Sequence, residues 1–522
     1  MLSAFTHLLN PIGFPAFHVD EGHYMRRTMQ VLQGLGPQES NATYDFPYDH
    51  PYFGQIFLAA ALSLVNYPDS LNPSVNLHSI EMLYLVPRVI MGILAIVDTF
   101  LVYKIAETRY NRKVGFISAT IFAVTPLSHL LRAILLDSIE LPFILLSILF
   151  AIYYAKSESR YSDTGRNDKN IILLLLSGIF LGLAMFTKAP VFTMIPLIAF
   201  ILIKKDCVKT GSRNTSINPL KVIGMWIVPV VLIPLIWPAY AISIGQFSEW
   251  LDGVVYQAER GSVQGLRHSI SVVSQSDPVL LVLGAAGIIY AIVKRDYFIL
   301  LWAFPYLIFL YAIGWVVYFH WISLIPLLCI GISIIIEKLT SRGYRKYRCL
   351  PAYGIISLVG IFGLFGIVMV MVSNLNASYN DVYLLVARQL SHHQDANPED
   401  GNEAVTLIGS HRTRALIWIP LYVFNDDAIF RDTDLPHDNF TKPIQTQKFI
   451  LVADSNLLER LTNAHKDERD SRITRLYYER SSTIATFIDK QSNIHEFMSI
   501  SENNGFGPFV EVRVNYNKND PF

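Results

Sequence analysis

Long apolar segments alternate with short polar loops between Met1 and Ser373, and this alternation restricts the chain to few folds. A helix needs about 20 apolar residues to cross the hydrocarbon core of a bilayer. The sequence therefore predicts a mainly α fold, a polytopic bundle of transmembrane helices. The expected spans lie near residues 84–105, 114–131, 135–155, 171–187, 189–205, 221–244, 279–293, 297–318, 321–337 and 351–373.

Lysine and arginine residues gather in every second loop between these segments. Short loops of this composition stay in the cytoplasm. The remaining loops, including the two long ones at 18–82 and 245–278, are then extracytoplasmic, or lumenal if the membrane is that of the ER. The basic clusters are Arg109/Arg112/Lys113, Lys156/Arg160/Arg166/Lys169, Lys204/Lys205/Lys209/Arg213/Lys221, Lys294/Arg295 and Lys338/Arg342/Arg345/Lys346/Arg348.

The composition excludes several classes of protein. Charged residues make up 16% of the chain, whereas soluble proteins carry about 25%. The net charge is zero, so we expect no basic field for nucleic acid and no nucleic-acid partner. Cys207 and Cys349 fall in predicted cytoplasmic loops and Cys329 in a span, which does not suggest a disulfide framework.

The segment 1–17 is apolar, but Pro11 and Pro15 interrupt it. At 1.5 Å per residue, a helix of this length barely crosses a bilayer. The segment is either a shortened first span or a partly inserted helix, and a cleavable signal peptide is less favoured because no basic start precedes it. In the first outer loop, the apolar stretch 53–65 is too short to span and is expected to lie along the membrane surface.

The composition becomes polar after Ser373. We expect a transmembrane domain at 1–374 and a small extracytoplasmic α/β domain at 375–522. Strand-like runs occur at 404–410, 448–453, 482–488 and 508–515, and helical patterns at 380–394, 413–424 and 455–464.

Asp20 and Glu21 follow the first apolar segment. A carboxylate at the membrane boundary can act as general base on an acceptor hydroxyl. The alternative is a solvated loop charge, or an aspartate that caps the following helix. Position alone slightly favours that alternative.

Five further positions on the predicted outer side are ionisable. Arg132 and Asp137 lie in the turn between two spans, where they either form a plain ion pair or face a cavity. Lys188 and Arg88 are each either a snorkelling side chain or a phosphate contact. His320 lies between two spans, where a lone histidine is more often interfacial than catalytic.

These residues come from separate parts of the sequence, yet the predicted topology places them on one face. An acidic group beside basic groups suits a phosphate-linked donor and a hydroxyl acceptor. Arg260 and Arg267, in the second outer loop, are further phosphate-binding candidates. A zinc site is not favoured, because the spacing within 18–23 differs from H-E-x-x-H. A divalent cation on Asp20 or Asp137 beside a phosphate is a more plausible cofactor.

The pattern resembles the GT-C superfamily of membrane glycosyltransferases, in particular the protein O-mannosyltransferase and lipid A aminoarabinose transferase branch. The resemblance is carried by short motifs between about residues 14 and 330. Gln55 stands where the family has lysine, which removes one candidate phosphate contact, and Tyr52 replaces the family's second proline. The matching elements are Asp20-Glu21 with Tyr24, His50 to Gln55, Arg88, Arg132 to Asp137, Lys188 to Pro190, and His320 to Pro326.

The resemblance implies a polyprenyl-phosphate-linked monosaccharide donor whose lipid tail lies among the spans. Asp20 would deprotonate the hydroxyl of a protein, lipid or glycan acceptor, which would attack the anomeric carbon and invert it. Lys188 and Arg132, with Arg260 or Arg267, would neutralise the departing phosphate, and Asp137 would orient Lys188 or the acceptor. The family pattern also makes Glu21 a catalytic candidate, Arg88 a phosphate contact, and His50, Tyr24 and His320 substrate contacts.

Two other functions stay open at this point. A transporter or flippase for a lipid-linked sugar needs ionisable residues at mid-span and broken helices in paired halves; Asp98 and Glu81 are the obvious acids near the first long span, and a matching second half is not visible. The other alternative is a non-catalytic membrane scaffold whose outer domain binds a partner. Loss of transfer in Asp20→Asn would separate an enzyme from both.

Overall fold

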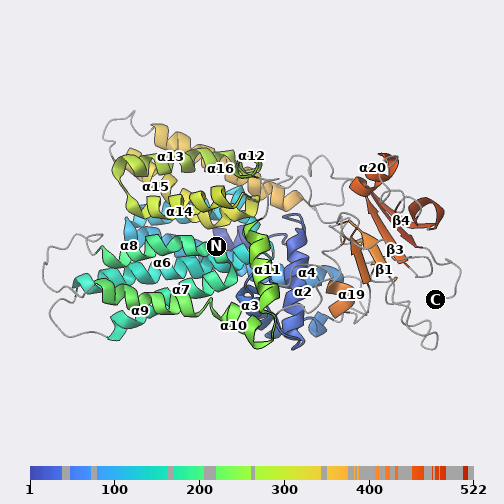
Figure 1. The fold of residues 1–522 in the computed structure, drawn as a ribbon. Helices are drawn as coiled ribbons and strands as arrows, with labels where there is room; N and C mark the ends of the chain where they lie inside the picture. The colour runs from blue at the N-terminus through green and yellow to red at the C-terminus, as the bar shows by residue number, and fades with distance from the viewer. Residues whose placement is uncertain are drawn as a thin grey trace. The chain divides into compact units, whose positions relative to one another are not determined.

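The computed structural model contains a large helical part and a five-stranded sheet near the C-terminus (Figure 1). The residues that it describes are 1–37, 48–71, 79–160, 168–204, 219–259, 265–314, 316–341, 350–373, 381–382, 385–386, 389, 406–410, 413, 418–423, 429–432, 449–463, 473, 476–480, 482–488 and 509–514.

The chain divides into two compact units. The first unit contains residues 1–9, 38–57 and 89–371, and the second contains 10–37, 58–88 and 372–522. The division therefore differs from a single boundary near 374, because two N-terminal segments group with the C-terminal part.

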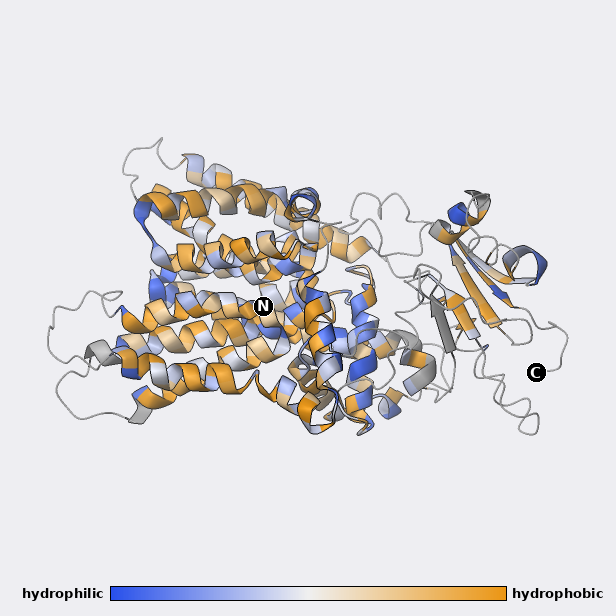
Figure 2. Cartoon of the chain, viewed as in Figure 1, coloured by the Kyte–Doolittle hydropathy of each residue, from blue (hydrophilic) through white to orange (hydrophobic). Residues whose placement is uncertain are grey.

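The first unit is a bundle of apolar helices. In Figure 1, α6, α7 and α9 lie side by side, and Figure 2 shows apolar residues along most of their length and hydrophilic residues near the helix ends. α3 (Phe53–Ser63) and α4 (Ser79–Arg109) extend from one unit into the other. The remaining helices are α1 (Leu2–Leu8), α5 (Arg112–Val124), η2 (Pro126–Arg132), α6 (Leu136–Arg160), α7 (Asp168–Thr187), η3 (Ala189–Met194), α8 (Ile195–Ile203), α9 (Pro219–Leu232), α10 (Ile236–Ser243), α11 (Phe247–Ala258), α12 (Leu266–Ser276), α13 (Pro278–Lys294), α14 (Tyr297–Ile313), η5 (Tyr318–Leu324), α15 (Ile325–Ser341) and α16 (Leu350–Val372).

The helices are those of a multi-pass membrane protein, although several differ from the predicted spans. Six are long and apolar enough to cross a bilayer, among the residues that the structure describes. The expected span 114–131 is broken, because α5 and η2 meet at 70°, and α13 follows α12 at a bend of 118°. The helices within the expected spans 189–205 and 297–318 are shorter than a full crossing.

Two spans occupy the centre of the first unit. In Leu136–Ser157 and in Tyr318–Ser341, 83% of the most apolar 18 residues are buried inside the protein. In Pro219–Ser243 and in Leu350–Val372, the buried share is 17%. The latter two therefore present most of their surface outward, as peripheral helices facing lipid would.

The segment 1–17 is not a complete helical span, since α1 ends at Leu8. α1 packs on α4, where a Cβ atom added at Gly92 would lie 2.6 Å from the carbonyl oxygen of His7. The hydroxyls of Ser3 and Thr99 lie 2.7 Å apart and extend this contact. The glycine permits the close approach, as small residues do at helix interfaces in membranes.

The predicted cytoplasmic ends of several helices meet at one end of the bundle. Tyr110 donates to a carboxylate oxygen of Asp296 at 2.8 Å, and Arg109 lies 3.5 Å from the other oxygen. Lys204, after α8, lies 5.0 Å from the ring centre of Tyr297. The short helices η2, η3 and η5 lie at the other ends of these helices.

The second unit contains the C-terminal sheet, whose strand order is β2-β1-β3-β5-β4. β1 pairs with β2 and β3 in parallel, whereas β5 pairs with β3 and β4 antiparallel. This mixed sheet confirms the predicted α/β fold of the C-terminal part, although β2 was not predicted. The strands are β1 (Thr406–Gly409), β2 (Ile429–Asp432), β3 (Phe449–Asp454), β4 (Ser482–Ile488) and β5 (Phe509–Val514).

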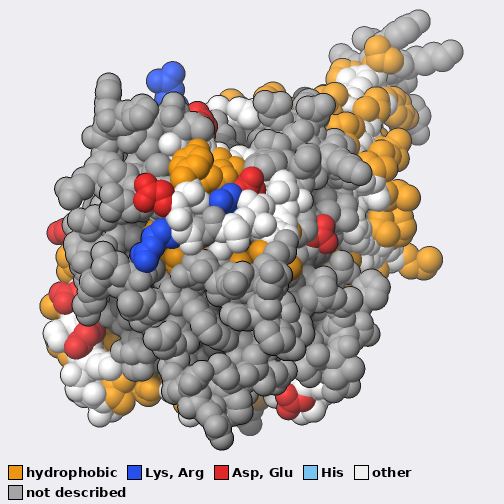
Figure 3. Space-filling view, turned by 90° about the vertical axis from the view of Figure 1, so that its right-hand side faces the viewer, with side chains coloured by type: hydrophobic (Ala, Val, Ile, Leu, Met, Phe, Trp, Pro, Cys, Tyr) orange, Lys and Arg blue, Asp and Glu red, His pale blue; other side chains and the backbone are white. Residues whose placement is uncertain are grey.

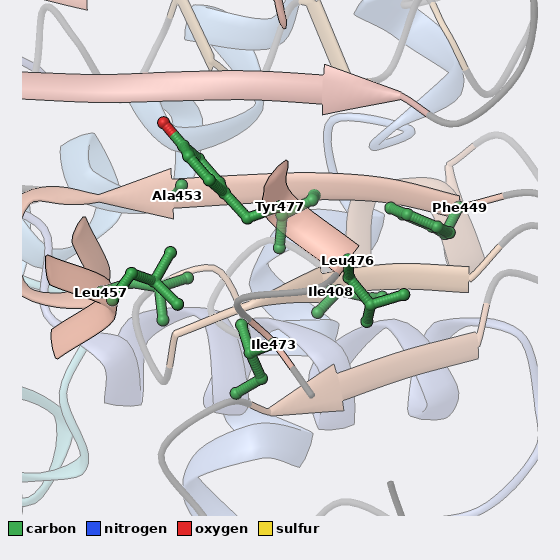
Figure 4. Close-up of a cluster of buried hydrophobic side chains, with 9 residues drawn as sticks. Ile408, Phe449, Ala453, Leu457, Ile473, Leu476 and Tyr477 are labelled. Carbon is green, nitrogen blue, oxygen red and sulfur yellow. The ribbon is translucent and has the colours of Figure 1, made fainter. Parts of the chain in front are cut away.

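One face of this sheet carries an apolar core. Figure 4 shows Ile408 and Phe449 from the strands packed with Ile473 and with Leu457 of α20 (Ser455–Asn463). The other strands carry charges of both signs, such as Glu511 and Arg513, which lie 3.1 Å apart on β5. In Figure 3, acidic and basic side chains also lie close to one another around hydrophobic ones.

The rest of the second unit includes α2 (Val19–Leu32) and η1 (Asp69–Leu71). The short helix α19 (Trp418–Tyr422) docks on α2, where Gln30 donates to the hydroxyl of Tyr422 at 2.8 Å. Trp418 is buried and donates to the hydroxyl of Tyr84 at 3.1 Å. The C-terminal part therefore packs on α2, the helix that contains Asp20 and Glu21 in its first turn.

Candidate functional site

A buried ion pair joins two of the predicted residues. Asp137 lies in the first turn of α6, and Lys188 follows the last residue of α7. The Lys188 ammonium donates to both carboxylate oxygens of Asp137, at 2.8 and 2.6 Å. Their side chains are 1% and 5% exposed, so each charge is neutralised by the other in a low-dielectric environment.

Further groups surround this pair in the first unit. The ring of Phe319 lies 5.1 Å from the Lys188 nitrogen, which is within cation–π range. Glu140 lies one helical turn after Asp137 and accepts from the Ser323 hydroxyl at 3.0 Å. The elements that meet here are η3, η5 and the central helix α6, which come from remote parts of the sequence.

Arg132 is fully buried at the end of η2, and its guanidinium donates to the carbonyl oxygen of Leu9. The rings of His7 and His129 are 6.0 Å apart. His7 is fully buried, and His129 is 1% exposed. Sequence reasoning missed both histidines, because neither lies in a polar motif.

Asp277 fixes the position of η2. Its carboxylate accepts from the hydroxyl of Thr125 and from the backbone N–H of Leu127, and it also caps α13 through the N–H of Leu280 at 2.9 Å. One buried carboxylate thus joins the bend before α13 to the bend after α5. Because Arg132 is the last residue of η2, these contacts also help to position Arg132.

Gln55 is another residue whose environment the sequence did not reveal. Its side chain is 1% exposed, and neither amide atom has a hydrogen-bond partner among the described residues. The preceding Gly54 packs against Leu136 and Thr187, the residues just before Asp137 and Lys188 in the chain. Buried unpaired amides are rare in native structures, and they mark strain, a bound ligand or an ordered water.

Asp20 lies in the second unit, in the first turn of α2. Its backbone N–H donates to the ring of His18 at 3.1 Å, and its carboxylate lies 3.6 Å from that ring. The Asp20 side chain is 35% exposed. Its carboxylate therefore stays accessible to a substrate hydroxyl.

Glu21 differs sharply from its neighbour. It is buried and receives two hydrogen bonds from Arg88, at 2.6 and 2.9 Å. The remaining Arg88 nitrogen donates to the carbonyl oxygens of Pro11 and Pro15. The guanidinium is thus committed to internal partners, so this geometry favours a structural role for the pair over the predicted catalytic and phosphate-binding roles.

The other predicted residues lie in varied settings. Tyr24 is buried on α2, and His50 precedes α3. The ring of His320 accepts from the backbone N–H of Val317 at 3.3 Å, which is a local structural contact. Arg267 is exposed on α12, and Arg260 lies outside the described residues.

The geometry does not favour a divalent cation on Asp137. The Lys188 ammonium already occupies both carboxylate oxygens, at the place where a metal would bind. No group of three or more histidine, cysteine or acidic ligands is found among the residues that the structure describes.

Comparison with known proteins assigns this fold. Residues 40–246, which include the Asp137–Lys188 pair, match the family model described as dolichyl-phosphate-mannose-protein mannosyltransferase. ArnT from Cupriavidus metallidurans, in its crystal structure bound to undecaprenyl phosphate, aligns over 99% of this chain and 96% of that chain, with a TM-score of 0.57 and 10% identity. The fold is that of the GT-C superfamily.

A second GT-C structure agrees over a smaller region. The Archaeoglobus fulgidus oligosaccharyltransferase in complex with zinc and sulfate aligns over 80% of this chain, with a TM-score of 0.51 and 14% identity. The present chain covers 60% of the length of that protein. A search of curated protein sequences found no match.

Proposed function

We propose that this chain is an integral membrane inverting glycosyltransferase. It moves a monosaccharide, mannose or a related sugar, from a polyprenyl-phosphate donor to a hydroxyl of a protein, lipid or glycan. The transfer takes place on the outer or lumenal face of the membrane. Support comes from the GT-C fold, from the match to the mannosyltransferase family model, and from the distribution of basic loops.

The observation that carries the proposal is the buried ammonium of Lys188. An ammonium has three N–H donors, and Asp137 accepts two of them. The third is left for a phosphate oxygen of the donor. A fixed cation in a dry site stabilises charge that develops on a leaving phosphate more strongly than water does.

The chemistry follows from two roles. Asp20 takes the proton of the acceptor hydroxyl while that oxygen forms a bond to the anomeric carbon. The bond between this carbon and the phosphate oxygen breaks, and its electron pair leaves with the phosphate. Because attack and departure occur on opposite faces, the configuration is inverted. Lys188 donates its third N–H to the phosphate, and Arg132, with Arg267 or Arg260, supplies positive charge that stabilises it.

Structures with a similar fold contain polyprenyl phosphates. The ArnT structure holds undecaprenyl phosphate, and a further structure of the Archaeoglobus fulgidus enzyme holds dolichol phosphate. We propose a lipid donor of this chemical class for the present chain. A divalent cation, if one takes part, would have to bind away from the Asp137 carboxylate.

A transfer assay tests the proposal. Purified protein is incubated with a panel of polyprenyl-phosphate sugars and hydroxyl acceptors, and the released polyprenyl phosphate is measured. At least one sugar should be transferred with inversion, and Lys188→Ala should lower the rate by about 10²-fold, as loss of an oxyanion-stabilising donor does. Vesicle uptake of a lipid-linked sugar without any transfer would instead favour a transporter.

A further inference from the structure

Glu140 is the second carboxylate near the Asp137–Lys188 pair, and one of its two oxygens has a hydrogen-bond partner among the described residues. Glu140 is 2% exposed on the central helix α6. Its Oε1 accepts from the Ser323 hydroxyl at 3.0 Å, whereas Oε2 is buried without a hydrogen-bond partner in the described part of the chain. A buried polar atom left in this way costs free energy unless something else binds it.

The charges around Glu140 do not balance if it is ionised. The groups that interact with it are Asp137 on the same helix, Lys188 before η3, Ser323 on η5 and Tyr306 on α14. Lys188 is the cation among them, and Asp137 already holds it with both oxygens. A negative charge on Glu140 would therefore be buried beside a neutral ion pair, which is far more costly than burying a carboxylic acid.

We propose that Glu140 is an uncharged carboxylic acid whose Oε2–H donates a hydrogen bond to an oxygen of the lipid-linked donor. This inference rests on the proposed function. A neutral acid has one O–H donor and retains an acceptor, so Ser323 can donate to Oε1 while Oε2 faces the ligand. The partner is an acceptor oxygen, on either the phosphate or the sugar. Glu140 is then a donor-binding residue.

A set of substitutions separates this role from a charged one. Glutamine copies the neutral acid, because it offers N–H at one position and a carbonyl oxygen at the other. Glu140→Gln should therefore keep donor affinity within about threefold of wild type, and Glu140→Ala should weaken it about tenfold, the worth of one hydrogen bond. Glu107→Gln, at the far end of α4, removes a carboxylate elsewhere and should leave affinity unchanged.

The experiment measures binding of undecaprenyl phosphate, with and without an attached sugar, to each purified variant between pH 6 and 9. Thermal unfolding of the same samples reports whether each variant is folded. If Oε2–H binds the phosphate, Glu140→Ala weakens both lipids. If it binds the sugar, only the glycosylated lipid is affected. Wild type and Glu140→Gln should show the same pH dependence.

Folded Glu140→Gln that binds as weakly as Glu140→Ala would overturn the inference, since glutamine cannot replace an ionised carboxylate. Full donor affinity in folded Glu140→Ala would overturn it too. Both results leave the proposed function intact, because wild-type protein still binds and turns over the donor. Wild-type protein that binds no polyprenyl phosphate of either kind would overturn the proposed function and this inference together.

Discussion

At the scale of single residues, the acidic pair Asp20-Glu21 occupies two different environments, since Asp20 is partly exposed and Glu21 is buried. Arg88 donates to both carboxylate oxygens of Glu21, and the side chains of Arg88 and Glu21 are fully buried. Removal of one partner from a buried ion pair costs about 3–5 kcal/mol, whereas exchange of both for apolar residues is often neutral. The pair is therefore expected to support the fold and to leave the chemistry to Asp20.

We predict that Glu21→Leu and Arg88→Met each lower the thermal unfolding temperature strongly in detergent, and that the double variant recovers most of the loss. Unfolding followed by intrinsic fluorescence measures this. If the double variant is as stable as wild type yet transfers no sugar, Glu21 or Arg88 takes part in the reaction and the structural assignment is wrong.

At the scale of elements, glycines determine how closely the spans approach. A side chain at Gly287 of α13 would come within 2.8 Å of the backbone of Gly331 on α15. A side chain at Gly354 of α16 would meet nothing within 4 Å. Without a hydrophobic effect between helices in lipid, such close packing is a main source of association.

We predict that Gly287→Ala destabilises the bundle, because the two backbones must separate. The matched change Gly354→Ala should be neutral or slightly stabilising, since alanine favours helix over glycine by up to about 1 kcal/mol. Unfolding temperatures of the two variants, purified in the same detergent, make the comparison. Equal effects at the two positions would contradict the helix contact described here.

At the scale of the whole molecule, the sequence was sufficient for the coarse architecture. Hydrophobic length and loop charge predicted the bundle, and period-two runs predicted β1, β3, β4 and β5. For Asp137, position alone suggested an ion pair with Arg132, and the family resemblance placed it beside either Lys188 or the acceptor; the structure pairs it with Lys188. Whether Asp20 meets that pair stays a prediction, because the two lie in separate units.

Other features depend on packing that no local pattern encodes. Glu140 and Gln55 look like ordinary polar residues at helix ends, and only the tertiary fold buries them. The bend at η2 arises where the Asp277 carboxylate accepts from Thr125 and Leu127, within a segment that hydropathy predicted as one span, 114–131. The 3₁₀ helix η5 likewise includes residues 321–324, which the sequence assigned to the span 321–337.

The most direct test of the account is Asp20→Asn. The substitution removes the basic carboxylate with almost no change in shape, so the variant should fold and bind the polyprenyl-phosphate donor as wild type does. Transfer should fall on the order of 10²–10⁴-fold, the usual contribution of a general base. A folded Asp20→Asn protein that transfers sugar at the wild-type rate would contradict the account.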